Sequence, residues 1–303
     1  MKDLISIHDL SAQEIEKILE LAKNLKKSPY QKTLEGKSLA MIFEKPSTRT
    51  RVSFEVGMYQ LGGTTVHLSP NAVQLGVRET IADVARTLSR YVDGVMLRTF
   101  DHNNLIEFAK YSTVPVINAL SDLSHPCQAL ADILTIREHK GDFSNLKAAY
   151  IGDGNNVCHS LMLAAAKVGL NLIVATPKGF GPSPEIVKQA FEDAQATGVE
   201  IDIMNDPVAA ASKADVIYTD VWASMGQEKE TKDRAKKFKN FQINEKLVSF
   251  AKPDYIFMHC LPAHRDYEVT NEVIESSNSV VFDQAENRLH VQKAILAILL
   301  GKV

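Results

Sequence analysis

Short apolar runs alternate with helical patterns along nearly the whole chain, and this alternation restricts the possible folds more than any other feature. In the first half, apolar runs bounded by turn residues predict strands at Leu39–Phe43, Val66–Leu68, Gly94–Leu97 and Val116–Asn118. Strands that are connected through helices pair in parallel, because a crossover is needed to return the chain to the same end of the sheet. The repeated order therefore predicts an α/β fold with helices on both faces of open parallel sheets.

The same pattern restarts after the polar stretch Glu138–Asp142, which separates two runs of strands. The later strands are expected at Ala148–Ile151, Leu172–Ala175, Glu200–Met204, Val216–Thr219, Tyr255–Met258 and Val280–Phe282. Two runs of strands of this length predict two open parallel-sheet domains.

The boundaries of the domains follow from this break. We expect a first domain over residues 1–135, which begins with a helix after the capping-box sequence Ser11-Ala12-Gln13-Glu14, and a second domain over residues 136–285. A helix from Pro126 to Glu138 would cross between them, and a last helix, within residues 286–303, would return to the first domain. Interdomain helices would thus join the two halves.

Composition excludes several classes of protein. The 303 residues include 34 basic and 37 acidic ones, a net charge of −3, so no overall positive field exists to bind nucleic acid or an anionic membrane. No apolar run approaches the ~20 residues that cross a bilayer, and the start lacks the apolar core of a signal peptide, so we expect a cytoplasmic protein. Three cysteines without a Cys-x-x-Cys pair argue against disulfides and against a cysteine-rich zinc site.

A polar turn after the first predicted strand has the composition of an anion site. Ser47-Thr48-Arg49-Thr50-Arg51 opens a predicted helix, where free backbone N–H groups, hydroxyls and guanidinium groups can bind a phosphate dianion. The alternative is a solvated helix start that is capped by Ser or Thr. A Walker loop is excluded because the Gly-x4-Gly-Lys frame is missing.

Two other strand ends of the first half carry polar groups. Arg98 ends one predicted strand, and His125-Pro126-Cys127-Gln128 follows the next and opens a helix. A histidine N–H can donate to a carbonyl oxygen, and the Gln128 amide can bind an oxygen or an amino group. A lone histidine is more often structural, but ligands of open α/β sheets bind at the carboxyl ends of strands, where all these groups are expected.

The second half contains a turn that begins like a dinucleotide fingerprint. Gly152-Asp153-Gly154-Asn155-Asn156 follows a predicted strand, but Val157 stands where the third glycine would be, and no acid for a ribose occurs near Thr176. These departures argue against nicotinamide binding. The two asparagines would either cap the next helix or bind polar groups of a substrate.

Acid and thiol groups follow later strands. Asp220 begins the loop Asp220–Gly226 and could bind an ammonium group, unless this is an ordinary surface loop. His259-Cys260-Leu261-Pro262 ends another strand; adjacent His and Cys side chains point in different directions from a strand, which argues against zinc. Glu286-Asn287-Arg288 opens the last helix. These residues would either cap that helix or form part of a ligand site. Together these groups predict two ligands that meet in an interdomain cleft.

On these motifs the sequence is identified as a member of the transcarbamoylase family. Ser47–Arg51 and His125–Gln128 resemble the carbamoyl phosphate segments of transcarbamoylases in general. Ser224–Gly226 and His259–Pro262 are similar to the segments of members that use ornithine rather than aspartate. The motifs, including Glu286–Arg288, span nearly the whole chain in the family's order.

The resemblance implies transfer of a carbamoyl group from carbamoyl phosphate to the side-chain amine of L-ornithine, which gives L-citrulline and phosphate. The implied carbamoyl phosphate site comprises Ser47, Thr48, Arg49, Thr50, Gln74, Arg98, His125, Gln128, Cys260, Leu261 and Arg288. The implied ornithine site comprises Asn156, Asp220, Ser224 and Met225. The implied catalytic residues are Arg98, His125, Cys260 and Arg288.

The family's properties imply further features. A homotrimer is expected, in which Gln74 reaches the site of a neighbouring subunit, and the reaction belongs to arginine biosynthesis. Attack of a neutral amine on the carbamoyl carbon creates an oxyanion, which fixed positive charges and hydrogen-bond donors stabilise. The chemistry therefore requires no metal, no cofactor and no enzyme nucleophile, and Cys260 would position the amine. Ala263-His264-Arg265-Asp266 lies where relatives vary and receives no role.

Three alternatives stay open. A transcarbamoylase acting on another amine, such as putrescine or acetylornithine, is disfavoured by Ser224-Met225-Gly226. An NAD-dependent dehydrogenase is supported only by the pair Gly152 and Gly154. A non-catalytic sensor would bind carbamoyl phosphate without turnover.

Overall fold

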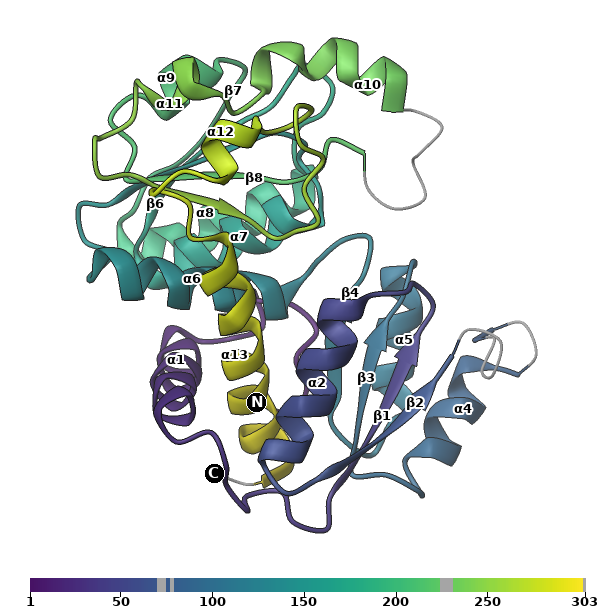
Figure 1. Ribbon diagram of the computed structural model, residues 1–303. Coiled ribbons are helices and arrows are strands. Elements are labelled where there is room, and N and C mark those ends of the chain that lie inside the picture. Colours follow the sequence, from purple (N-terminus) through teal and green to yellow (C-terminus); the bar gives the residue numbers. More distant parts are fainter. Residues whose placement is uncertain (70–74, 77–78, 224–230, 302–303) are drawn as a thin grey trace. The chain divides into compact units, whose positions relative to one another are not determined.

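Two compact units make up the part of the chain that the computed structural model describes, which is residues 1–69, 75–76, 79–223 and 231–301 (Figure 1). Unit 1 consists of Met1–Ala131 and Glu286–Val303, and unit 2 is Asp132–Ala285. Each unit contains one parallel sheet, of four and five strands respectively, so the predicted α/β class is confirmed. None of the helices in the described ranges is both long and apolar enough to span a membrane.

Unit 1 has the strand order β2-β1-β3-β4. Its elements are α1 (Ala12–Lys27), β1 (Ser38–Phe43), α2 (Thr48–Gln60), β2 (Thr64–Leu68), α4 (Ile81–Leu88), β3 (Gly94–Arg98), α5 (His102–Tyr111) and β4 (Val116–Leu120). Helix α6 (Pro126–Lys140) begins in unit 1 and ends in unit 2, whereas α13 (Val281–Gly301) begins in unit 2 and ends in unit 1. The capping box at Ser11 is present at the start of α1, as predicted.

Helices cover both faces of the sheet in unit 1. Val84 of α4 and Phe108 of α5 share one buried cluster with Val95 of β3. On the other face, α13 comes so close to β3 that a Cβ atom on Gly94 would lie 3.0 Å from the Leu300 side chain. The sheet of this unit is therefore buried on both faces, as parallel sheets generally are.

Unit 2 has the strand order β7-β6-β5-β8-β9. Its strands are β5 (Lys147–Ile151), β6 (Asn171–Ala175), β7 (Ile201–Met204), β8 (Val216–Thr219) and β9 (Ile256–His259). Its further helices are α7 (Asn156–Val168), α8 (Pro184–Thr197), α9 (Pro207–Ala211), α10 (Thr231–Phe238), η2 (Lys239–Phe241), α11 (Glu245–Val248) and α12 (Asn271–Ile274).

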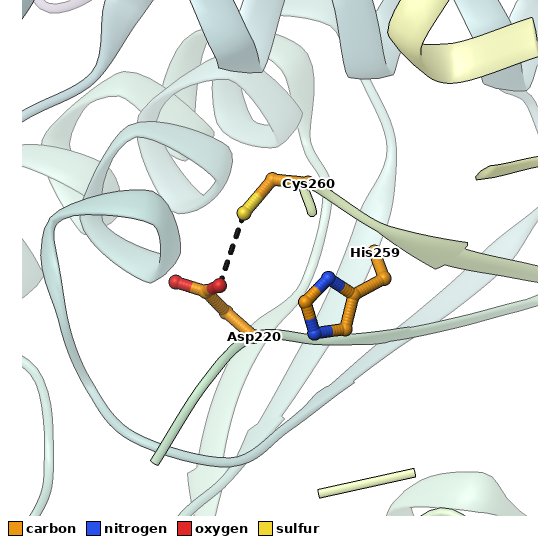
Figure 2. A group of neighbouring side chains, drawn as sticks. All are labelled: Asp220, His259 and Cys260. Atoms are coloured by element: carbon orange, nitrogen blue, oxygen red, sulfur yellow. Dashed lines mark hydrogen bonds between the residues drawn. The ribbon is translucent and has the colours of Figure 1, made fainter. Parts of the chain in front are cut away.

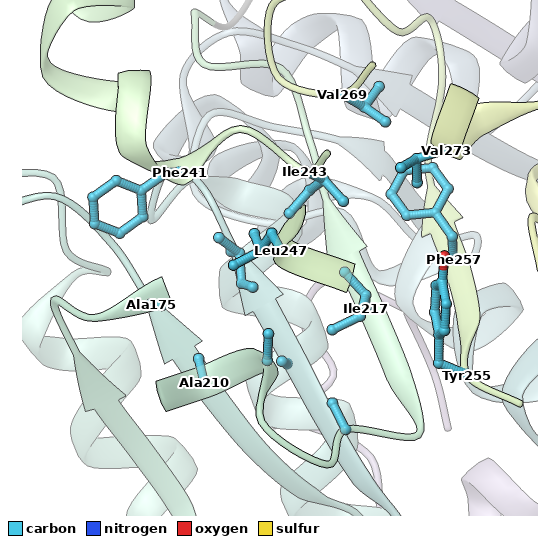
Figure 3. Close-up of a cluster of buried hydrophobic side chains, with 14 of the residues drawn as sticks. Ala175, Ala210, Ile217, Phe241, Ile243, Leu247, Tyr255, Phe257, Val269 and Val273 are labelled. Carbon is cyan, nitrogen blue, oxygen red and sulfur yellow. The ribbon is translucent and has the colours of Figure 1, made fainter. Parts of the chain in front are cut away.

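The core of unit 2 uses the alternation of side chains along its strands. On one face, Ile217 of β8 and Phe257 of β9 pack in a cluster with Leu247 of α11 (Figure 3). On the other face, Tyr150 and Tyr218 lie with their ring centroids 5.7 Å apart. Neighbouring residues of a strand point to opposite faces, so each strand supplies both layers.

One predicted strand, Val280–Phe282, is wrong. Ser279 does form an isolated bridge with Phe257, and the Val280 N–H donates to the Phe257 carbonyl over 3.0 Å. The apolar run then continues directly into α13, which begins at Val281. A run of three apolar residues cannot distinguish a buried strand from the buried first turn of a helix.

Both sheets contain a point at which the order of strand addition reverses. In unit 1 this point lies between β1 and β3, and in unit 2 it lies between β5 and β8. The connections that leave such neighbouring strands run to opposite sides, which opens a crevice at their carboxyl ends. We therefore expect ligands beyond β1 and β3 in unit 1, and beyond β5 and β8 in unit 2.

Packing explains one glycine of the turn after β5. A Cβ atom on Gly154 would lie 2.3 Å from the carbonyl carbon of Gly181 and 2.3 Å from the nitrogen of Pro182. No such contact is tolerated between a side chain and the backbone, so this glycine is explained without a dinucleotide.

We predict that Gly154→Ala lowers the free energy of unfolding by about 3 kcal/mol, measured by urea denaturation. Gly181→Ala is the matched control, because a Cβ atom there would meet only the Thr176 hydroxyl, at an ordinary 3.8 Å. Equal stability of Gly154→Ala and the unsubstituted protein would contradict this account of the turn.

Candidate active site

The predicted site residues fall into two groups, one in each unit, which we call the first and the second half-site. The first half-site begins at the amino end of α2, directly beyond β1. Ser47 is the N-cap of this helix, with its hydroxyl accepting from the Thr50 N–H at 3.3 Å and donating to the Thr50 hydroxyl at 3.1 Å. Thr48 is exposed, and Arg49 is half-buried. The helix start predicted from the sequence is present together with its serine cap, and its first turn carries no acid that would oppose an anion.

Arg288 connects three helices of unit 1. Its guanidinium, almost fully buried, donates to the Gln128 side-chain oxygen at 2.6 Å and to the Thr50 hydroxyl at 3.3 Å. Gln128 lies in the first turn of α6, Thr50 in the first turn of α2, and Arg288 on α13. Residues that are far apart in the sequence are thus brought together in one half-site.

Arg98 and His125 also belong to this half-site. Arg98 is the last residue of β3 and lies opposite Phe43, the last residue of β1. His125 precedes α6, and its burial, followed by the positive charges of Arg288 and Arg98, holds the pKa of the imidazole well below its ordinary value. The ring is therefore neutral at neutral pH, and it can donate a hydrogen bond without adding a further positive charge.

Lys45 is a further cation here, to which the sequence analysis gave no role. Its side chain is buried, with the ammonium group 4.1 Å from the centroid of the Phe100 ring. Burial first, and then the charge of Arg98, lower the pKa of this lysine. Its position two residues before the Ser47 cap was a signal that could have identified it.

The second half-site lies in unit 2, beyond β5 and β8. Asn155 is the N-cap of α7, and its side-chain oxygen accepts from the backbone N–H groups of Val157 and Cys158 at 3.0 and 3.1 Å. Its amide nitrogen also donates to the Asp220 carboxylate at 2.7 Å. Capping therefore accounts for Asn155, while Asn156 is the half-buried first residue of α7.

Asp220 is the central acid of this half-site. The Cys260 thiol donates to one oxygen of its carboxylate at 3.0 Å (Figure 2). The Asn155 amide donates to the other oxygen. Asp220 is 5% exposed, whereas Cys260 is only partly buried. These two hydrogen bonds hold the carboxylate in position.

The backbone after Cys260 has an uncommon conformation. Leu261 has a φ angle of +57°, and its N–H donates to the His259 Nδ1 atom at 2.9 Å. That atom therefore carries no proton, and the other ring nitrogen, Nε2, donates to the buried Glu268 carboxylate at 3.2 Å. The histidine of the motif thus supports the loop on which Cys260 and Leu261 lie.

These residues also form a group with metal-ligating atoms. Asp220, His259 and Cys260 each offer one such atom, and the three atoms lie within 4.8 Å of one another. Both ring nitrogens of His259 already have protein partners, so this residue could bind a metal only by losing one of them. The donor set thus fits a tetrahedral ion poorly.

Three residues of the predicted site, Gln74, Ser224 and Met225, lie outside the described residues. The others fall into two groups, one in each unit. The first group carries positive charge and donors, and the second carries a buried carboxylate. Such groups suit a phosphorylated acyl donor and an amine acceptor, respectively.

This combination of fold and sites defines a carbamoyltransferase, and the chain belongs to the aspartate/ornithine carbamoyltransferase family. Residues 2–138 match the carbamoyl-P binding domain of the family. Residues 144–299 match its Asp/Orn binding domain. The family inferred from the motifs is thereby confirmed.

The most informative relatives are ornithine carbamoyltransferases. The chain is 58% identical over 307 residues to the enzyme of Thermococcus kodakarensis, across 100% of this chain and 97% of the relative. The solved structure of the Pyrococcus furiosus enzyme is 57% identical, with a TM-score of 0.97 over 100% of this chain and 98% of that one. The anabolic enzyme of Campylobacter jejuni is 44% identical, with a TM-score of 0.95 over 100% of both chains.

The lowered pKa of His125 predicts a pH dependence of stability. Between that lowered pKa and the ordinary value of about 6.5, the unfolded chain binds more protons than the folded one, so stability falls as the pH falls through this window. His125→Asn removes this contribution. We expect the free energy of unfolding to depend less on pH in the variant, by up to about 1.4 kcal/mol per pH unit, when urea denaturation is compared at pH 7 and pH 5.

A second readout keeps this prediction testable if the variant does not fold. We expect the NMR signals of the His125 ring in the unsubstituted protein to be those of a neutral imidazole at pH 6. A charged ring at that pH, or an equal pH dependence of both proteins, would contradict the prediction.

Proposed function

We propose that this chain transfers the carbamoyl group of carbamoyl phosphate to the side-chain amine of L-ornithine, which gives L-citrulline and phosphate. The observation that carries this proposal is the 58% identity to an ornithine carbamoyltransferase over the full length of the chain. The charges of the two half-sites agree with it, because a phosphate dianion suits the first and an ammonium group suits the second.

Carbamoyl phosphate is assigned to the first domain, over residues 1–135 with the returning helix 286–303. In this assignment the phosphate is bound by the amino end of α2, and the carbamoyl group is bound by Arg98, His125 and Gln128. The basic charge around Arg288 and the serine-capped helix start support it. The proposed phosphate ligands are Ser47, Thr48, Arg49 and Thr50, with Gln74 supplied by a neighbouring subunit.

Ornithine is assigned to the second domain, over residues 136–285. Its amino-acid end would be bound by Asn156, Asp220, Ser224 and Met225. The almost fully buried carboxylate of Asp220 supports this assignment, because a charge in such a place is stabilised by an ammonium partner. Cys260, Leu261 and Arg288 would surround the point at which the side-chain amine meets the carbamoyl carbon.

The mechanism follows from fixed donors rather than from a covalent intermediate. The lone pair of the neutral amine attacks the carbamoyl carbon, and the electrons of the C=O bond move to the oxygen. Collapse of this oxyanion re-forms the C=O bond and breaks the bond between the carbamoyl carbon and the phosphate oxygen. The departing phosphate takes up the proton that the nitrogen loses. Arg98 and the neutral His125 stabilise the oxyanion, while the Cys260 thiol, already bonded to Asp220, positions the amine.

The proposal includes the assembly and the setting of the enzyme. We expect a homotrimer, because the role of Gln74 requires a neighbouring subunit. The names of the Pyrococcus furiosus and Campylobacter jejuni relatives, which are called anabolic, support a place in arginine biosynthesis. A cytoplasmic location stays a prediction, which fractionation of cells that produce the protein would test.

The experiment that tests this function offers carbamoyl phosphate with ornithine, putrescine, acetylornithine or aspartate in separate assays of phosphate release and ureido product. We predict rapid citrulline formation with ornithine alone. Turnover with another amine would overturn the assignment of ornithine as the acceptor. No turnover with any of the four amines would favour a non-catalytic sensor of carbamoyl phosphate. Binding of a nicotinamide cofactor, detected by calorimetry, would instead favour an NAD-dependent dehydrogenase.

A further inference from the structure

We propose that Asp132 is a positioning residue for the ornithine half-site, acting through Tyr218 and Gln284 on Asp220 and Cys260. This inference rests on the proposed function. Asp132 lies on α6, four residues beyond the His125–Gln128 segment, and its side chain is fully buried within unit 2.

A network of buried polar side chains surrounds Asp132. One carboxylate oxygen accepts from the Tyr218 hydroxyl at 3.1 Å, and the other accepts from the Gln284 amide nitrogen at 2.7 Å. The same amide nitrogen lies 3.0 Å from the Tyr218 hydroxyl. The oxygen of the Gln284 amide accepts from the backbone N–H of His259 at 2.9 Å. None of these side chains is exposed to solvent.

The network ends at the two strands that carry the ornithine half-site. Tyr218 lies on β8, two residues before Asp220, which follows that strand. His259 is the last residue of β9 and directly precedes Cys260. The strands are paired in parallel, with Thr219 opposite His259. Immediately beyond this pair, the Cys260 thiol donates to the Asp220 carboxylate at 3.0 Å. A shift of either strand end would therefore alter the relative positions of the two groups.

Stability alone does not explain a carboxylate in this place. Removing a charge from water is costly, and apolar residues of similar volume often stabilise a core equally well. A carboxylate can, however, orient two donors at once, and here these donors come from β8 and α13. Burial, followed by the charge of Asp132, raises the pKa of Tyr218 well above its ordinary value, so the hydroxyl keeps the proton that it donates.

The test compares Asp132→Ala with Asp215→Ala. Asp215 is the matched control, since it is also buried and precedes β8 at the opposite end, where it accepts from the Lys147 N–H at 2.9 Å and the Lys252 ammonium group at 2.8 Å. We expect Asp132→Ala to raise the KM for ornithine between about tenfold and a hundredfold, because small misplacements of binding groups have effects of this size. The KM for carbamoyl phosphate should change less than about twofold in both variants.

A second readout does not depend on turnover. Cys260 is the partly exposed cysteine, whereas Cys127 and Cys158 are buried, and burial raises the pKa of both buried thiols. The rate at which a thiol reagent labels Cys260 therefore reports on its hydrogen bond with Asp220. We expect Asp132→Ala to change this rate at least about threefold and Asp215→Ala to leave it unchanged.

Conservative variants keep the inference testable if Asp132→Ala does not fold. Asp132→Asn retains an acceptor oxygen and should recover most of the ornithine affinity, whereas Tyr218→Phe removes one hydroxyl and should weaken it. An unchanged ornithine KM and labelling rate in folded Tyr218→Phe would overturn the inference.

The outcomes separate the two proposals. No citrulline from the unsubstituted protein overturns the proposed function, and the labelling rates then decide the positioning role. An active unsubstituted protein with equal ornithine KM values for Asp132→Ala and Asp215→Ala overturns the positioning role alone.

Discussion

The first half-site depends on the hydrogen bonds that the buried guanidinium group of Arg288 donates. A charged group away from water must be compensated by hydrogen bonds, and this one donates to Gln128 and Thr50. The first turns of α6 and α2 are thereby tied to α13 within unit 1. Burial lowers the pKa of His125 most, and the same charge lowers it further, so that the ring stays neutral. One cation thus holds the geometry of the proposed carbamoyl phosphate site and adds to the effect of burial on its histidine.

The second half-site follows the same physical rule with the opposite charge. The Asp220 carboxylate, which follows β8, is held by the Asn155 amide and the Cys260 thiol, so its position is fixed by partners from the ends of two other strands, β5 and β9. Preorganised groups of this kind require little reorganisation when charge develops during a reaction. The two units therefore supply complementary charges, each on its own sheet and each at the point where the strand order reverses.

The sequence predicted those features of the fold and the site that are indicated by patterns within a short segment of the chain. Alternating strands and helices placed Ser47, Arg98 and Asp220 at the carboxyl ends of strands, where the structure has them. The network of Asp132 could not be predicted, because Tyr218 and Gln284 lie 86 and 152 residues away along the chain and no spacing indicates that they meet. The binding role of each site residue stays a proposal, because the position of a side chain does not establish what it binds.

We expect the two hydrogen bonds of Arg288 to organise the proposed carbamoyl phosphate site. The most direct test measures carbamoyl phosphate affinity by calorimetry in the unsubstituted protein and in Arg288→Lys, which keeps the charge but loses the planar fork of donors. We expect a folded variant that binds carbamoyl phosphate at least about tenfold more weakly, which is the effect of losing one charge-assisted hydrogen bond. Equal affinity of the two proteins would contradict it.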